Sequence, residues 1–226
     1  VSGFGMDLHE WKNSNDEISG RLVNEGIATV QFSFAGCGKS EGDYRHMTLE
    51  RQARQIEDVI AWCLNSFGPG ISLGIHATSM GVPSLLLANI SNISSLCLVA
   101  GVYEVNRSIH KVYEEERGIS IDYRGTTLLP RGSGASTPVG PEFWKSIEAF
   151  TIQSVIDKVT MPALLIHGDN DTKVTTEEVK GVFAAIPSNE KRLKIFAGGD
   201  HGIVDVLRPM REEFLAEVTE WFKKTL

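Results

Sequence analysis

The chain has 226 residues, of which 42% are hydrophobic, 23% charged and 8% aromatic. This composition supports a sizeable buried core and excludes disordered, collagen-like and disulfide-scaffold proteins. The 29 acidic and 22 basic residues give a formal net charge of −7, so we expect no nucleic-acid partner. We predict a single domain over residues 1–226.

No stretch of the sequence approaches the roughly 18–20 consecutive apolar residues of a membrane span, so we expect no membrane association. The three cysteines, Cys37, Cys63 and Cys97, are an odd number at spacings that match no metal motif. Free thiols in a reducing compartment are the simplest interpretation, which favours a cytoplasmic protein. We assign no metal site and no cofactor.

Short β-rich apolar runs alternate with longer amphipathic runs along the chain. This pattern is typical of an α/β fold, with a mostly parallel sheet that carries helices on both faces. Five runs predict strands, at residues 27–34, 71–77, 95–100, 163–166 and 192–196. Five amphipathic runs predict helices, at residues 10–25, 49–65, 82–89, 176–185 and 211–224.

The alternation weakens between residues 102 and 151. Gly, Pro and Ser crowd into residues 129–138, which predicts a long loop, and helix-like stretches at 110–117 and 141–150 flank it. We interpret residues 102–151 as a small cap inserted into the domain. The alternative is a surface excursion that takes no part in binding.

The second predicted strand leads directly into Ala77-Thr78-Ser79-Met80-Gly81 and then into a predicted helix. A nucleophile elbow has this strand–turn–helix order, with a serine at its apex and small residues two positions before and after it. Ala77 and Gly81 meet that need, and the helix N-terminus offers free N–H groups. The alternative is a serine that only caps the helix.

Two further segments place polar residues at strand ends. The fourth strand is followed by Asp169 and Asp171, and the fifth by His201. Because the carboxyl ends of parallel strands meet at one edge of a sheet, an acid and a histidine are expected beside Ser79. The chain order of nucleophile, acid and base is the one typical of a serine hydrolase of this architecture.

With these motifs the sequence resembles the α/β-hydrolase superfamily over nearly its whole length. Residues 2–5 look like the family's His-Gly-Phe-Gly oxyanion loop, and residues 26–42 look like its strand that ends in Asp-x-Arg-Gly-x-Gly-x-Ser. The family pattern His-Gly-x-x-Asp favours Asp171 over Asp169 as the triad acid. Residues 38–42 and 47–49 are most similar to small-capped carboxylesterases of the feruloyl and cinnamoyl esterase type.

The resemblance implies a cofactor-free serine carboxylesterase that cleaves small, fairly apolar esters through an acyl-enzyme on Ser79. Asp171 and His201 would complete the triad, and the backbone N–H groups of Phe4 and Met80 would form the oxyanion hole. From their place in the cap, we further hypothesise that four apolar side chains wall the substrate pocket: Leu128, Leu129, Phe143 and Trp144.

The sequence also departs from the family pattern. Ser2, Ser33 and Ala35 stand where the family has His, Asp and Arg. Because the sequence starts at the oxyanion loop, we expect the first three strands of the family's sheet to be missing. Truncation, a neighbouring subunit in a homodimer, or a different closure of the sheet would each account for this.

Two other functions remain open from the sequence. The same three residue types also serve carbon–carbon bond hydrolysis of vinylogous diketones in this superfamily. A catalytically inactive hydrolase-like binding module is the other alternative.

Overall fold

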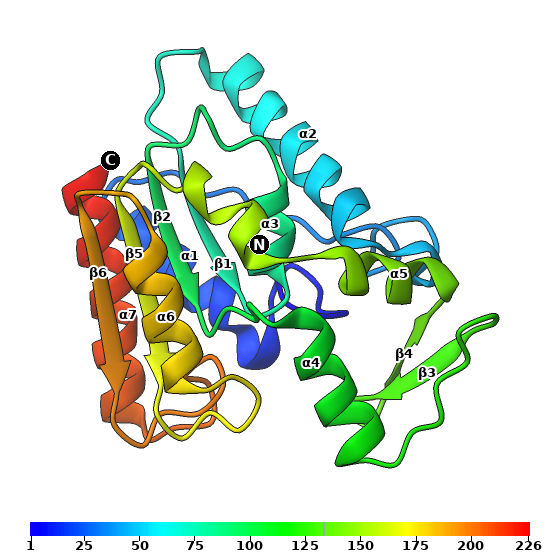
Figure 1. Ribbon diagram of the computed structural model, residues 1–226. Coiled ribbons are helices and arrows are strands. Elements are labelled where there is room, and N and C mark those ends of the chain that lie inside the picture. The colour runs from blue at the N-terminus through cyan, green and yellow to red at the C-terminus, as the bar shows by residue number, and fades with distance from the viewer. Residues whose placement is uncertain (133) are drawn as a thin grey trace.

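The computed structural model describes residues 1–132 and 134–226. Its central sheet has four parallel strands in the order β1-β2-β5-β6 (Figure 1). These strands are β1 (Gly74–Thr78), β2 (Ser95–Val99), β5 (Ala163–Gly168) and β6 (Lys191–Phe196). The register pairs Thr78 with Val99, and Gly168 with Phe196, so the strands end at a common edge. The prediction of a parallel sheet flanked by helices is confirmed.

Helices cover both faces of this sheet, and successive side chains of a strand pack against the helices on opposite faces. In β2, Leu96 and Leu98 pack with residues of α2 (Leu49–Phe67), α3 (Gly81–Leu87) and α6 (Thr176–Ala185). The intervening Cys97 and Val99 pack with residues of α1 (Ser14–Asn24) and α7 (Arg208–Thr225). The strands are therefore apolar on both sides, as their continuous hydrophobic runs predicted.

Local capping explains where α2 and α6 begin. Thr48 precedes α2, and its hydroxyl accepts the N–H of Arg51. At the start of α6, the Thr175 hydroxyl accepts the N–H of Glu178 while the Glu178 carboxylate accepts the N–H of Thr175. This reciprocal capping box fixes α6 at the residues that the sequence predicted. Short 3₁₀ turns complete the chain: η1 (Trp11–Asn13), η2 (Tyr44–His46), η4 (Ile152–Ser154) and η5 (Ile156–Lys158).

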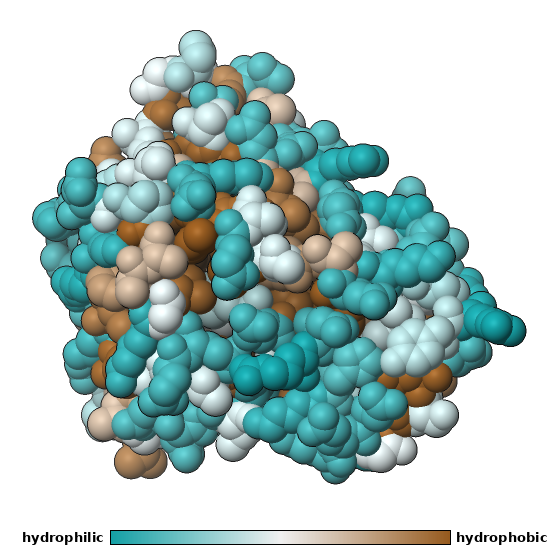
Figure 2. Space-filling view, viewed as in Figure 1, coloured by the Kyte–Doolittle hydropathy of each residue, from teal (hydrophilic) through white to brown (hydrophobic). Residues whose placement is uncertain are grey.

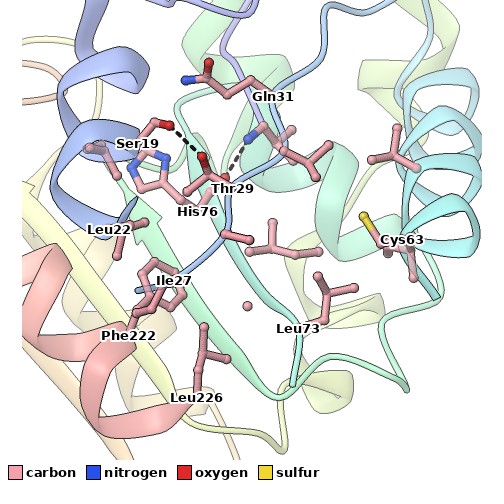
Figure 3. A pocket seen from close by; sticks show the side chains of 18 of the residues that line it. Ser19, Leu22, Ile27, Thr29, Gln31, Cys63, Leu73, His76, Phe222 and Leu226 are labelled. Carbon is pink, nitrogen blue, oxygen red and sulfur yellow. Dashed lines mark hydrogen bonds between the residues drawn. The ribbon is translucent and has the colours of Figure 1, made fainter. Parts of the chain in front are cut away.

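The predicted strand at residues 27–34 is wrong. An apolar cavity of about 510 Å³ lies between residues 26–32 and the segment 71–76 that contains most of β1 (Figure 3). Side chains from α1, α2 and α7 also line the cavity, among them Leu22, Cys63 and Phe222. A strand needs a neighbouring backbone as hydrogen-bonding partner. Because this space separates residues 27–34 from β1, no ladder forms there in the part of the chain that is described.

Residues 102–151 contain more regular structure than the sequence indicated. Helix α4 (Val105–His110) continues into a π-helical turn, η3 (Lys111–Glu115), and α5 (Pro141–Ala149) follows later. Between them, β3 (Thr127–Pro130) and β4 (Ser136–Val139) form an antiparallel hairpin where a loop was predicted. Ser133, which belongs to that predicted loop, lies outside the described residues. A two-stranded ribbon has an unpaired outer side on each strand, so it tolerates Pro130 and Pro138.

On the face shown in Figure 2, apolar side chains are densest near the centre and hydrophilic side chains cover the edges. Within residues 1–132 and 134–226, none of the helices combines the length and apolar character that crossing a bilayer requires.

Candidate active site

Ser79 stands in a strained turn at the carboxyl end of β1. Its φ of 53° lies in the left-handed region, which is uncommon for a non-glycine residue, and its N–H donates to the Val99 carbonyl at 2.9 Å. A Cβ atom on Gly81 would lie 2.6 Å from the Ser2 carbonyl oxygen. Residue 81 must therefore be glycine for the N-terminal loop to pass this close to the elbow.

His201 joins Ser79 to Asp171. Its Nε2 lies 2.8 Å from the Ser79 Oγ, and its Nδ1 lies 2.7 Å from the Asp171 Oδ2. Asp171 follows β5 and His201 follows β6. The backbone is close-packed where these two segments meet, since a Cβ atom on Gly168 would overlap the Gly199 carbonyl oxygen. The structure thus brings together the three residues that the sequence singled out for a triad.

The Asp171 carboxylate is fully buried and surrounded by donors. Besides His201, its Oδ1 accepts the N–H groups of Lys173 at 2.8 Å and Val174 at 3.2 Å. Burial alone would raise the pKa of Asp171, but the hydrogen bond and charge of His201 and these N–H groups hold it below its ordinary value. An ionised Asp171 favours a proton on Nδ1 of His201, which leaves Nε2 free to accept from the serine hydroxyl.

The neighbouring acids are engaged elsewhere. The Asp169 carboxylate accepts the N–H of Gly198 at 2.6 Å. The Asp200 carboxylate accepts the N–H groups of Val204 and Asp205. The geometry therefore favours Asp171 over Asp169 as the partner of His201.

The loop at residues 3–6 is fixed by two side chains that the sequence analysis missed. Gly3 donates its N–H to the Glu10 carboxylate at 2.5 Å, and Gly5 donates its N–H to the Tyr44 hydroxyl at 2.9 Å. No local sequence pattern predicts these contacts. Tyr44 is 39 residues from Gly5, and Glu10 falls inside a predicted helix. The actual α-helix begins only at Ser14.

Ser2 also helps to hold this loop. Its hydroxyl donates to the Asp7 carbonyl at 2.7 Å and accepts from the Asn15 amide at 3.1 Å. A serine at this position therefore still ties the loop to the following turn and to α1.

The two predicted oxyanion donors differ from their neighbours in the hydrogen bonds they make. Met6 donates its N–H to the Gly3 carbonyl at 3.2 Å, and Gly3 and Gly5 have the acceptors given above. For the N–H groups of Phe4 and Met80, in contrast, the described part of the chain provides no acceptor. Neither N–H group is therefore engaged by a hydrogen bond within the described residues.

The four predicted pocket residues have different environments. Phe143 is fully buried, and its ring centroid lies 5.6 Å from that of Phe4. The ring centroid of Trp144 lies 5.0 Å from that of Phe143, and Trp144 is 3% exposed. Leu129 is fully buried in the core, whereas Leu128 is 60% exposed. Phe143 thus packs against the loop at residues 3–6.

The cysteines lie in the interior and are free. Cys37 lines a polar cavity of about 340 Å³ beside the loop at residues 3–6, together with Gly5, Asp7 and Arg131. Burial raises the pKa of the Cys37 thiol to about 11, so this sulfur is not a nucleophile at neutral pH.

Comparisons with known proteins agree with this architecture. Residues 143–205 match the family described as "Serine aminopeptidase, S33". The chain is 22% identical over 244 residues to an uncharacterized 31.7 kDa protein from the traX-finO intergenic region of Escherichia coli, an alignment that spans 91% of this chain and 83% of that protein.

Among solved structures, the fold is similar to Est1E from Butyrivibrio proteoclasticus with bound ferulic acid, at a TM-score of 0.81 and 20% identity over 100% of this chain and 87% of that chain. It is also similar to a monoacylglycerol lipase from Paleococcus ferrophilus, at a TM-score of 0.73 and 18% identity over 100% of this chain and 93% of that chain. The sheet topology and these superpositions show that the chain has the α/β-hydrolase fold, the fold that the resemblance of its motifs implied.

Proposed function

We propose that this protein is a serine carboxylesterase that cleaves small, fairly apolar carboxylic esters through an acyl-enzyme on Ser79. The observation that carries the proposal is the position of one imidazole, with Nε2 at 2.8 Å from the Ser79 Oγ and Nδ1 at 2.7 Å from a buried carboxylate. A serine hydroxyl is a weak nucleophile at neutral pH, and an adjacent base oriented in this way activates it.

Acylation follows from this geometry. The Ser79 Oγ attacks the ester carbonyl carbon while its proton passes to Nε2 of His201. Asp171 holds the ring in the required tautomer and stabilises the imidazolium that forms. His201 then returns the proton to the departing alcohol, which leaves the acyl group bound to the Ser79 Oγ. In deacylation, water attacks the carbonyl carbon of the acyl-enzyme while His201 accepts its proton. The proton then returns to the Ser79 Oγ as the carboxylic acid leaves.

The negative charge that develops on the carbonyl oxygen needs donors. The N–H groups of Phe4 and Met80 are suited to this role because one belongs to the loop over the elbow and the other directly follows the nucleophile. In other serine hydrolases, loss of one such donor lowers the rate by about 10²–10³-fold.

The class of substrate is inferred from the surroundings of the elbow. Phe4 packs against the rings of Tyr44, Tyr113 and Phe143, so the loop beside Ser79 is built on an aromatic cluster. The related fold of Est1E has been solved with ferulic acid, a small aromatic carboxylic acid. Both observations favour esters of small apolar or aromatic acids.

Hydrolysis of p-nitrophenyl acetate and p-nitrophenyl butyrate tests the proposal. We expect the purified protein to hydrolyse both esters and Ser79→Ala to lower kcat by a factor on the order of 10⁶, as loss of a triad nucleophile does. Ser154→Ala is the matched control, because that hydroxyl donates only to the nearby Thr151 carbonyl at an exposed site. Undiminished activity in Ser79→Ala, or none in a folded wild-type protein, would refute it.

A further inference from the structure

Glu10 is a buried acid with unusual partners. Its residue exposure is 9%, and within residues 1–132 and 134–226 it forms no ion pair with a basic side chain. A buried carboxylate is normally paired with a cation. Here its Oε2 accepts the Gly3 N–H at 2.5 Å and its Oε1 accepts the Trp11 N–H at 3.1 Å. Its partners are therefore backbone donors.

The backbone that carries this carboxylate is strained. Glu10 has a φ of 62°, and Lys12 and Asn13 have φ values of 52° and 57°. Non-glycine residues in the left-handed region persist only where the surrounding structure requires them. Three of them within four positions indicate that the chain is held in an unfavourable path, and that path directs the Glu10 side chain toward Gly3.

The carboxylate lies close to the nucleophile. A Cβ atom on Gly3 would lie 3.2 Å from the Ser79 Cβ and 3.5 Å from the Glu10 Oε2. Gly3 is thus packed between the elbow and Glu10, with its N–H turned to the carboxylate. The next N–H along the chain, that of Phe4, is left for another acceptor, and the N–H of Gly5 is held by Tyr44.

The interior position of Glu10 has an energetic cost. The pKa of Glu10 is raised, because burial outweighs the hydrogen bonds from the Gly3 and Trp11 N–H groups, which favour the ionised form. Placing this acid in the interior is unfavourable in itself, so its position points to a specific role.

We propose that Glu10 is a positioning residue for the oxyanion hole: by accepting the Gly3 N–H it orients the loop so that the Phe4 N–H faces the reacting oxygen. The catalytic consequence rests on the proposed esterase function. The structural part, in which Glu10 fixes Gly3, stands independently of turnover.

The kinetic test compares Glu10→Ala and Glu10→Gln with the wild type. Loss of loop orientation weakens binding of the transition state more than binding of the ester. We therefore expect Glu10→Ala to lower kcat and to leave KM little changed. The loss in kcat should approach the about 10²–10³-fold loss that follows removal of one oxyanion-hole donor. Glu10→Gln keeps one acceptor oxygen of similar size and should recover part of kcat.

Glu57 supplies the matched control, because its carboxylate also accepts a backbone N–H, that of Asn89 at 2.7 Å, at a site outside the triad and the oxyanion loop. Glu57→Ala should leave kcat unchanged. An unchanged kcat in folded Glu10→Ala, or an equal loss in Glu57→Ala, would overturn the proposal.

The Gly3 amide provides a readout that needs no catalysis. In ¹⁵N-resolved NMR spectra we expect the Gly3 N–H proton of Glu10→Gln to move upfield and to exchange faster with solvent than in the wild type, while Glu57→Gln leaves it in place. If the wild type lacks esterase activity, the proposed function fails and this measurement still decides the role of Glu10. An unmoved Gly3 resonance in Glu10→Gln would overturn that role.

Discussion

At the scale of single residues, the Asp171 carboxylate has an interior environment that is rich in hydrogen-bond donors. It is fully buried, and His201, Lys173 and Val174 direct donors at it. These contacts keep the carboxylate ionised, so its charge acts on the Nδ1 side of the imidazole. The role of Asp171 in the proposed mechanism follows from this environment, and it can be tested separately from the nucleophile.

Asp171→Asn should lower kcat by a factor on the order of 10⁴ because an amide no longer selects the productive tautomer of His201. Asp169→Asn is the matched control: the amide oxygen can still accept the Gly198 N–H, and Asp169 makes no hydrogen bond with His201. Steady-state hydrolysis of p-nitrophenyl butyrate measures both variants. Equal losses in the two variants would contradict the assignment of the acid.

The same residue predicts a pH dependence of stability. Because the pKa of Asp171 is lowered in the folded protein, its contribution to stability is present above the unfolded-state pKa of about 3.9 and is lost as the pH falls through the folded-state value. The difference in unfolding free energy between wild type and Asp171→Asn should shrink between neutral pH and about pH 3. Urea unfolding at several pH values measures it, and a difference independent of pH would contradict this expectation.

The sequence predicted Ser79, Asp171 and His201 because each stands in a short motif at a strand end. It did not predict Glu10 or Tyr44, since their partners Gly3 and Gly5 are backbone groups of a loop. A side chain that accepts a backbone N–H leaves no residue-type signature at the partner position. Such supporting contacts become visible only once the path of the chain is known.

At the scale of elements, predictions succeeded where the local pattern and the tertiary partners agree. Helix α6 has the predicted bounds because its capping box marks its start. The strand predicted at residues 27–34 has the right residue types but lacks a backbone partner. The hairpin of β3 and β4 was missed because its prolines masked a real alternation, in which Leu129 and Thr137 are buried and Leu128 is exposed.

Helix α5, within residues 102–151, contacts the proposed oxyanion loop through the packing of Phe143 against Phe4. We expect Phe143→Leu to change the ratio of kcat/KM for p-nitrophenyl butyrate and p-nitrophenyl phenylacetate. Leu128→Ala should change the ratio less, since the Leu128 side chain is 60% exposed. An identical ratio in wild type and Phe143→Leu would remove α5 from the account of specificity.

At the scale of the whole molecule, packing is uneven. The interior between β2 and β5 is filled from both faces, with Cys97, Leu98 and Leu164 fully buried. On the other side of β1, the cavity of about 510 Å³ separates the sheet from residues 26–32. The pattern of apolar residues alone could not predict this difference, because it depends on how segments distant in sequence come together.

Two cysteine variants should reveal this contrast. Cys63 lines the cavity, so Cys63→Leu should raise the free energy of unfolding by about 0.5–2 kcal/mol, as cavity-filling substitutions do. Cys97 is fully buried within the sheet, so Cys97→Leu should lower it by about 1–3 kcal/mol through overpacking. Urea unfolding midpoints measure both. The same sign of change in the two variants would contradict the uneven packing.

The central claim is that Ser79 is a nucleophile activated by His201. The most direct measurement is covalent labelling with diethyl p-nitrophenyl phosphate, a reagent that transfers a diethylphosphoryl group to an activated serine. Intact-mass and peptide mass spectrometry should show one added group on the peptide that contains Ser79. The Ser79→Ala variant should carry no added group, and labelling of the His201→Ala variant should not exceed background. Labelling at another residue, or an unlabelled Ser79 in the folded wild-type protein, would contradict the claim.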